Sequence, residues 1–424
     1  MDPDVAAVID RVWRAESARI VAGVAGVVRD VGLAEELAND ALVAALEQWP
    51  AEGVPDNPGA WLMLAARRRA VDRIRRDVRL RERVGQLGHE AHQRQQADAF
   101  NGLADFDAAV DDDVLKDDLL RLIFVSCHPA VAADARVALT LRVLGGLSTA
   151  EIARGFLTSE PTVAQRIVRA KRTLADKRIP FEVPEPAERA TRLASVLEVL
   201  YLIFNEGYSA TAGDDWLRPG LCEEGLRLAH LLAELAPTEP EVFGLLALME
   251  IQGSRLAARV DPAGAPIALD DQDRGRWDQA MIRRGFAALL HAERLLASTT
   301  AGPYVLQAAI AACHAQARTA GQTDWGRIAA LYDRLATLAP TPVVELNRAV
   351  AVAMSAGPAA GLEIVDRLAA EPALREYHLL PAVRADLLGR LGRHEQARAE
   401  FERAAALTAN ARERAVLLDR AART

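Results

Sequence analysis

The stretch DARVALTLRVLGGLSTAEIARGFLTSEPTVAQRIVRAKRTLADKR, residues 134–178, contains three helix signals in a row. The first helix can be capped by Asp134, and its apolar residues recur three and four positions apart until a Gly-Gly pair ends it. A short second helix begins at Ser148, which forms a capping box with Glu151. A third begins at Ser159, a favoured N-cap residue. Three helices with a tight turn before the last one predict a helix-turn-helix.

The third helix of this stretch has two chemically different faces. Residues of one face are apolar, and we expect them to be buried: Val163, Ile167, Ala170 and Leu174. Side chains on the other face can donate to base edges and phosphates in a DNA major groove: Thr162, Gln165, Arg166, Arg169 and Arg172. The alternative is a helical hairpin whose arginines are merely solvated. This segment alone leaves both interpretations open.

Residues 33–83 form a second informative segment, which starts with an amphipathic helix. One face is apolar, and another carries an acidic stripe that suits the basic surface of a partner. The apolar members are Leu42, Leu46 and Trp49, and the acidic members are Glu36, Asp40 and Glu47.

The next helix is expected to begin near Asn57-Pro58 and is first apolar, then strongly basic. Between residues 61 and 83 the sequence has nine arginines against three carboxylates, and Trp61 lies at the start. A helix with aromatic and basic groups together can hold phosphates and stack on unpaired bases. In the alternative, Trp61 belongs to the core and the arginines form a solvated face.

The composition bounds the class of protein. The chain has 424 residues, 51% hydrophobic and 26% charged, with a formal net charge of -8. This length predicts a soluble, folded protein of several domains. No apolar run approaches the roughly 18 residues that span a bilayer, so membrane insertion is not expected. The acidic N-terminus does not resemble an export leader. Three widely spaced cysteines indicate a reducing compartment, which we take to be the cytoplasm.

Motifs of enzymes and metal sites are missing from the sequence. The chain has no phosphate loop ending in Gly-Lys-Ser/Thr, no His-Glu-x-x-His and no Gly-x-Ser-x-Gly. The dipeptides Cys127-His128 and Cys313-His314 lie too far apart in the sequence for a structural zinc site. We therefore expect no catalytic residues, no metal and no cofactor.

Taken in order, the segments resemble the extracytoplasmic-function class of the sigma-70 family of RNA polymerase sigma factors, over roughly residues 10–178. LAEELANDA (33–41) resembles that family's polymerase-docking helix, and WLMLAARRRAVDRIRR (61–76) its -10-reading helix. EIA (151–153), SEPTV (159–163) and RAKRTL (169–174) resemble its -35-reading helix-turn-helix.

The resemblance implies two partners, core RNA polymerase and promoter DNA, and assigns candidate contacts to each. Core-polymerase contacts are expected at Leu33, Glu36, Leu37, Asp40 and Glu47. Contacts with the -10 element are expected at Trp61, Arg67, Arg68, Asp72, Arg73, Arg75 and Arg76. Contacts with the -35 element are expected at Ser159, Thr162, Gln165, Arg166, Arg169, Lys171 and Arg172.

From Thr191 onward the sequence reads as helix after helix. Ala349, Gly361 and Val365 recur at an offset of 36 as Ala385, Ala397 and Phe401, close to the ~34-residue tetratricopeptide spacing. The region resembles the tetratricopeptide-like extension of a subgroup of these sigma factors. It also contains clustered polar groups at Asn205, Glu206, Tyr208 and 271–274, which fit either helix capping with interhelix salt bridges or a regulatory surface.

These observations predict an all-α chain with a region 2 bundle (1–88), an acidic linker (89–118), a region 4 helix-turn-helix (119–180) and a helical-repeat regulatory domain (190–424). That last domain would contact the sigma domains or an unknown regulator. The predicted function is non-enzymatic promoter-specific transcription initiation. Two alternatives remain: a helix-turn-helix regulator with a repeat-based sensor that does not replace the sigma subunit, and a repeat scaffold with incidental basic segments.

Overall fold

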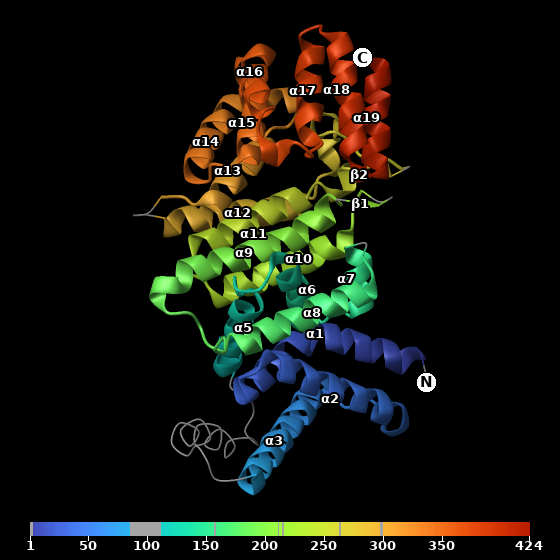
Figure 1. The fold of residues 1–424 in the computed structure, drawn as a ribbon, viewed down its shortest axis with the longest axis vertical. Coiled ribbons are helices and arrows are strands. Elements are labelled where there is room, and N and C mark those ends of the chain that lie inside the picture. Colours follow the sequence, from blue (N-terminus) through green and yellow to red (C-terminus); the bar gives the residue numbers. More distant parts are fainter. Residues whose placement is uncertain are drawn as a thin grey trace. The chain divides into compact units, whose positions relative to one another are not determined.

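The structure is a computed structural model (Figure 1) that describes residues 3–84, 112–156, 158–210, 212–213, 216–262, 264–296 and 300–424. The prediction of an all-α chain is confirmed. Within these ranges two strands occur, β1 (Ala212–Gly213) and β2 (Ala409–Asn410), which have two residues each and pair in parallel. The chain divides into two compact units, Met1–Leu200 and Tyr201–Thr424, which are described separately. No described helix is both long and apolar enough to cross a bilayer.

The first unit begins with α1 (Pro3–Val28), α2 (Val31–Glu52) and α3 (Pro58–Val84), which pack against one another. We call them the N-terminal bundle. The carboxylate of Asp30 accepts a hydrogen bond from the N–H of Leu33 at 2.8 Å and so caps α2. Helix α5 (Asp112–Ser126) begins inside the segment expected to be a linker, packs on α1 and also contacts α6. The rest of that expected linker, 89–111, lies outside the described residues.

The buried face of α2 differs in part from the expectation. Of the three residues predicted to form one apolar face, Trp49 is buried, Leu42 is half-buried and Leu46 is 37% exposed. Small residues fill the buried face instead: Ala34, Ala38, Ala41, Ala44 and Ala45. A stripe of alanines lets a neighbouring helix approach closely, and a leucine on the flank of that stripe therefore stays outside.

The predicted helix-turn-helix is present as α6 (Ala133–Val143), α7 (Thr149–Gly155) and α8 (Glu160–Asp176). The Ser148–Glu151 capping box and the Ser159 cap are confirmed. All four apolar residues predicted for the inner face of α8 are buried. The assignment of Asp134 as a cap was wrong: Ala132 occupies that position, and Asp134 pairs with Arg166 at 2.9 Å.

The first part of α9 (Pro186–Tyr208) belongs to the same unit and is tied to the helices before it. The hydroxyl of Ser195 donates to the carbonyl of Cys127 at 2.6 Å, and Arg192 donates to the carbonyl of Phe124 at 2.9 Å. Both bonds satisfy carbonyls near the C-terminus of α5, which an isolated helix leaves unpaired.

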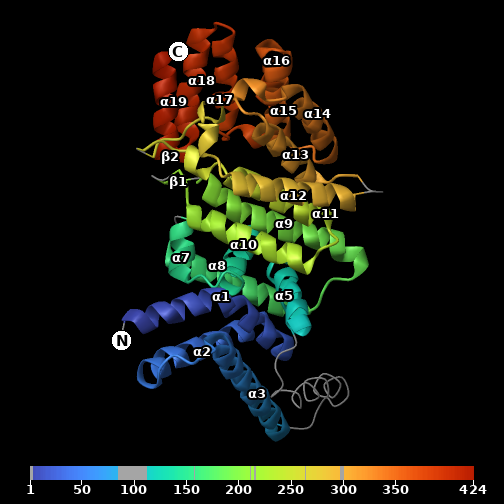
Figure 2. The same ribbon diagram turned by 180° about the vertical axis from the view of Figure 1, so that it is seen from behind.

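The second unit continues as a succession of helices that pack on their sequence neighbours (Figure 2). The α-helices are α10 (Pro219–Leu235), α11 (Pro240–Gly253), α12 (Gln279–Leu295), α13 (Pro303–Gln316), α14 (Trp325–Leu338), α15 (Pro342–Ala356), α16 (Pro358–Leu368), α17 (Leu379–Arg390), α18 (His394–Leu407) and α19 (Ala411–Arg423). The short 3-10 turns are η1 (Leu256–Ala258), η2 (Leu269–Asp271), η3 (Arg274–Arg276), η4 (Ala320–Gln322) and η5 (Pro372–Leu374).

Both predicted helical pairs of the repeat are present, as α15 with α16 and α17 with α18, and their six marker residues are buried. A Cβ atom at Gly361 would lie 2.4 Å from the Cβ of Ala353, so the first pair crosses too closely for any larger residue. Gly392 adopts φ +74 at the turn of the second pair, a conformation that glycine tolerates at no steric cost.

Candidate nucleic-acid interface

The outward face of α8 carries the side chains best placed to meet DNA. Gln165, Arg169 and Arg172 are exposed and fall three and four residues apart, so they form one stripe. Arg172 forms a 3.4 Å ion pair with Asp176, which exposure to water makes weak. Val168 lies on the same stripe and is 64% exposed. An apolar side chain there can contact a thymine methyl group, a role that our sequence analysis missed.

The N-terminal end of α8 holds its candidates differently. The hydroxyls of Ser159 and Thr162 lie 2.8 Å apart, and Ser159 accepts from the N–H of Thr162 at 3.3 Å. Both residues therefore shape the start of the helix, where free N–H groups attract phosphate. Arg166 is half-buried and turns back to Asp134 of α6.

Lys171, another candidate, lies in a buried ion cluster centred on Glu35 of α2. Glu35 is 6% exposed. Its carboxylate accepts hydrogen bonds from Nε of Arg142 on α6 at 2.7 Å and from Nζ of Lys171 at 2.5 Å. Asn39 bonds both Glu35 and Arg142. Burial would raise the pKa of Glu35, but the charges and hydrogen bonds of Lys171 and Arg142 outweigh it and hold the pKa below its ordinary value. The cluster joins the helix-turn-helix to the N-terminal bundle.

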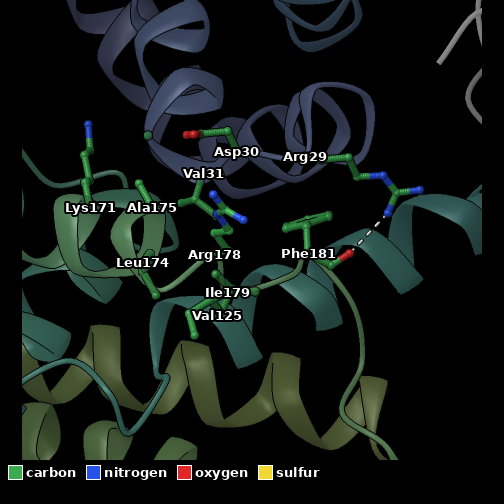
Figure 3. A pocket seen from close by; sticks show the side chains of 11 residues that line it. Arg29, Asp30, Val31, Val125, Lys171, Leu174, Ala175, Arg178, Ile179 and Phe181 are labelled. Atoms are coloured by element: carbon green, nitrogen blue, oxygen red, sulfur yellow. Dashed lines mark hydrogen bonds between the residues drawn. The ribbon is translucent and has the colours of Figure 1, made fainter. Parts of the chain in front are cut away.

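Two further contacts join the N-terminal bundle to the helix-turn-helix and to the segment that follows it. Arg14 of α1 pairs with Glu151 of α7, and Nη1 of Arg29 donates to the carbonyl of Phe181 at 3.1 Å. Figure 3 shows this second bond beside a cavity of about 200 Å³. Lys171, Leu174, Arg178 and Ile179 line the cavity from the helix-turn-helix side, and Arg29 to Gly32 line it from the α1–α2 turn.

The basic helix α3 divides its candidate residues between an inner and an outer side. Trp61 is half-buried and meets Trp49 edge to face, with ring centroids 5.4 Å apart. Arg67 is half-buried; desolvation lowers its pKa, and the nearby charge of Asp118 acts against that shift. The remaining candidates are exposed and form an outer, mainly cationic surface: Arg68, Asp72, Arg73, Arg75 and Arg76.

The candidate polymerase contacts on α2 comprise exposed carboxylates and leucines that are buried or half-buried. Glu36, Asp40 and Glu47 are exposed, as the acidic stripe requires. Leu33 is half-buried, and Leu37 is 6% exposed and packs inside the unit. The exposed carboxylates can therefore meet a basic partner while Leu37 positions their helix.

Comparisons with known proteins match these two parts of the first unit. Sigma-70 region 2 matches residues 13–80, and Sigma-70, region 4 matches residues 121–174. ECF RNA polymerase sigma factor SigK of Mycobacterium ulcerans (strain Agy99) is 31% identical over 163 residues, which cover 37% of this chain and 78% of that protein. The chain belongs to the extracytoplasmic-function sigma factors of the sigma-70 family. The N-terminal bundle is thus a sigma region 2, and the helix-turn-helix is the DNA-binding part of a region 4.

Similarity extends beyond the sigma regions. Uncharacterized protein R00370 of Rhizobium meliloti (strain 1021) is 44% identical over 389 residues, 92% of this sigma factor and 89% of that protein. A family of unknown function (DUF6596) matches residues 192–293. The solved structure Human IFIT1 dimer with PPP-AAAA matches 72% of this chain and 74% of that chain at 14% identity, with a TM-score of 0.27.

Cys127 and His128 directly follow the end of α5, whereas Cys313 and His314 lie within α13. Cys127 is buried, its Sγ lies 3.4 Å from Oγ1 of Thr140, and burial raises its pKa. His128 has a pKa lowered to about 4, chiefly because it is desolvated. In the part of the chain that the structure describes, no group of three or more His, Cys, Asp or Glu residues is arranged to hold a metal ion.

Proposed function

We propose that this sigma factor acts without catalysis of its own: it binds core RNA polymerase through α2 and directs it to promoters through α3 and α8. The observation that carries the proposal is the presence, in one chain that matches both sigma regions, of two separate helices with exposed cationic faces. Phosphate neutralisation by such faces supplies most of the affinity of a DNA-binding protein.

On this proposal the cationic face of α8 binds the -35 element of the promoter and that of α3 binds the -10 element. Gln165, Val168, Arg169 and Arg172 would read the -35 element, with Ser159, Thr162 and Arg166 supporting the start and inner side of α8. Lys171 would reach a phosphate only after giving up its ion pair with Glu35. The outer arginines of α3 would hold the -10 backbone, and Trp61 would meet an unstacked base. Residues 190–424 would form the regulatory domain, which contacts the sigma domains or a separate regulator.

Replacing Arg169 by alanine is expected to weaken promoter binding and to reduce the slope of log affinity against log salt by roughly one, because one phosphate contact is lost. Holoenzyme binding to a promoter fragment, measured over a range of salt concentrations, tests this. Arg398→Ala removes an equally exposed arginine from α18 and should leave the slope unchanged. A wild-type slope in R169A would contradict the assignment of α8.

Reversing the acidic stripe with the double substitution Glu36→Lys and Asp40→Lys is expected to weaken binding to core polymerase by about tenfold or more, because like charges at an interface cost several kcal/mol. Titration of labelled full-length chain with core enzyme measures the effect. Glu395→Lys on the exposed face of α18 is the control. If the wild-type chain bound promoter DNA but not core enzyme, the chain would instead be a regulator that does not replace the sigma subunit.

A further inference from the structure

Two arginines of the second unit are withdrawn from solvent, Arg255 fully and Arg259 in part. Arg255 and Arg259 flank the short turn η1, and Arg255 is 8% exposed. Neither guanidinium forms an ion pair with a carboxylate of the described residues; the groups that act on the charge of Arg259 are Tyr208, Arg255 and Cys222. Elsewhere in this unit a buried charge is compensated, since Glu250 bonds Arg284 at 2.9 Å and His230 at 2.8 Å.

Aromatic rings hold these guanidinium groups in place. The guanidinium carbon of Arg259 lies 3.7 Å from the ring centre of Tyr208, and that of Arg255 lies 5.7 Å from the same ring. Arg255 and Arg274 lie 5.8 and 4.9 Å from the ring centre of Trp277. Cation–π contacts of this kind stabilise a cation by about 0.5–2 kcal/mol each and fix its plane. They do not neutralise its charge.

The surroundings are therefore electropositive. Desolvation lowers the pKa of Arg259, and the neighbouring Arg255 lowers it further. The pKa of His314 is lowered to about 4 by burial and by the charges of Arg255 and Arg274. Arg274 is anchored by bonds to the carbonyls of His314 and Ala317, at 2.6 and 2.8 Å. Like charges that the described residues leave without a carboxylate cost several kcal/mol in a poorly solvated site, so the fold maintains this arrangement against a penalty.

Hydrogen-bond donors in the same cluster also lack partners. In the described residues, the Nε atoms of Arg255 and Arg259 and Nε1 of Trp277 are buried and unbonded. Native proteins contain few such atoms, and each calls for an explanation such as an absent ion or ligand. Here three donors share a cluster that also has an excess of positive charge. A doubly negative group with several acceptor oxygens would supply both the missing hydrogen-bond acceptors and the missing negative charge.

The polar residues 271–274 lie next to this cluster in the sequence and differ in their burial. Asp271 and Asp273 are exposed, whereas Gln272 is buried and Arg274 reaches inward. Two of the polar groups expected to serve either capping with ion pairing or a regulatory surface serve the first of these roles, since Asp273 caps η3 and Glu206 pairs with Arg218.

We propose that Arg255, Arg259 and Trp277 form a binding site in the C-terminal unit for a phosphate group, either free or as a phosphomonoester. Three N–H donors, two of them on guanidinium groups held against aromatic rings, match the several acceptor oxygens and double charge of a phosphate. Arg274 lies at the edge of the site. This site is separate from the residues proposed to bind DNA and does not depend on them.

Thermal unfolding of the full-length chain with inorganic phosphate, compared with chloride at equal ionic strength, tests the proposal. A ligand that binds only the folded state raises the unfolding temperature in a saturable way, and we expect this for the wild type. The double variant Arg255→Met and Arg259→Met should lose the response. Without phosphate this variant should unfold at the same temperature as the wild type or higher, because uncompensated buried charges have been removed. This second readout separates loss of the site from misfolding.

Four outcomes would overturn the proposal. The first is an identical response of the wild type to phosphate and chloride, and the second is a wild-type response in the double variant or in Arg259→Lys, which loses the planar donor geometry. The third concerns Asp214 and Asp215, which lie outside the described residues. If the chain responded to phosphate only after both were changed to asparagine, they would be the counter-ions. Arg283→Met, an exposed site on α12, is the control, and succinate tests whether carboxylates bind equally, which would refute the phosphate assignment.

Discussion

Replacing Glu35 by glutamine is expected to lower the free energy of unfolding of the first unit by about 3–5 kcal/mol, because removing one member of a buried ion cluster leaves the others uncompensated. The carboxylate serves two cations at once, Arg142 and Lys171, and only 8% of its side chain is exposed. Thermal or denaturant unfolding of the full chain, followed at the first transition, measures the loss. Glu36→Gln changes the neighbouring exposed carboxylate and should shift stability by no more than about 0.5 kcal/mol.

The effect of Glu35→Gln should depend on pH in a defined direction. The pKa of Glu35 in the folded chain lies below the ordinary value of 4.5, so the folded state favours its ionised form. The stability it contributes is complete above pH 4.5 and is lost as the pH falls through the folded pKa. The difference between wild type and variant should therefore be full at neutral pH and shrink in acid. A difference that stayed constant below that range would contradict the charged cluster.

Replacing Trp49 by alanine is expected to destabilise region 2 by about 3–5 kcal/mol, the usual cost of emptying a large aromatic site in a core. Trp49 is 2% exposed, and its ring supports Trp61 edge to face. The substitution should thus also loosen the side chain proposed to meet the -10 element. Denaturant unfolding gives the stability, and binding of holoenzyme to promoter DNA under conditions where the variant is folded gives the second effect.

A matched control for Trp49→Ala lies on the same helix. Val43 is 51% exposed, and Val43→Ala should change stability by less than about 0.5 kcal/mol. If the two substitutions cost the same, the packing of α2 would differ from the one described. If Trp49→Ala reduced stability but left promoter binding intact, Trp61 would act as a core residue only.

Local chemistry explains which features the sequence predicted well. Capping at Ser148 and Ser159 depends on groups three residues away, and the inner face of α8 depends on a spacing of three and four. The order of the sigma-like segments supplied the family. By contrast, Asp134 was assigned as a cap from its own helix, and this assignment failed because the neighbouring helix α8 supplies Arg166, with which the carboxylate pairs.

The sequence by itself determined the three helices of the helix-turn-helix, the caps at Ser148 and Ser159, the cationic faces of α3 and α8, and membership of the sigma-70 family. Only the tertiary structure decided that Glu35 is buried between Arg142 and Lys171, from which it is separated by 107 and 136 residues. It also decided that Arg255 and Arg259 lie against the ring of Tyr208. The physical reason is the distance along the chain over which each kind of interaction acts. Helix propensity and capping act over about one turn, whereas burial and charge pairing depend on which distant segments the fold brings together.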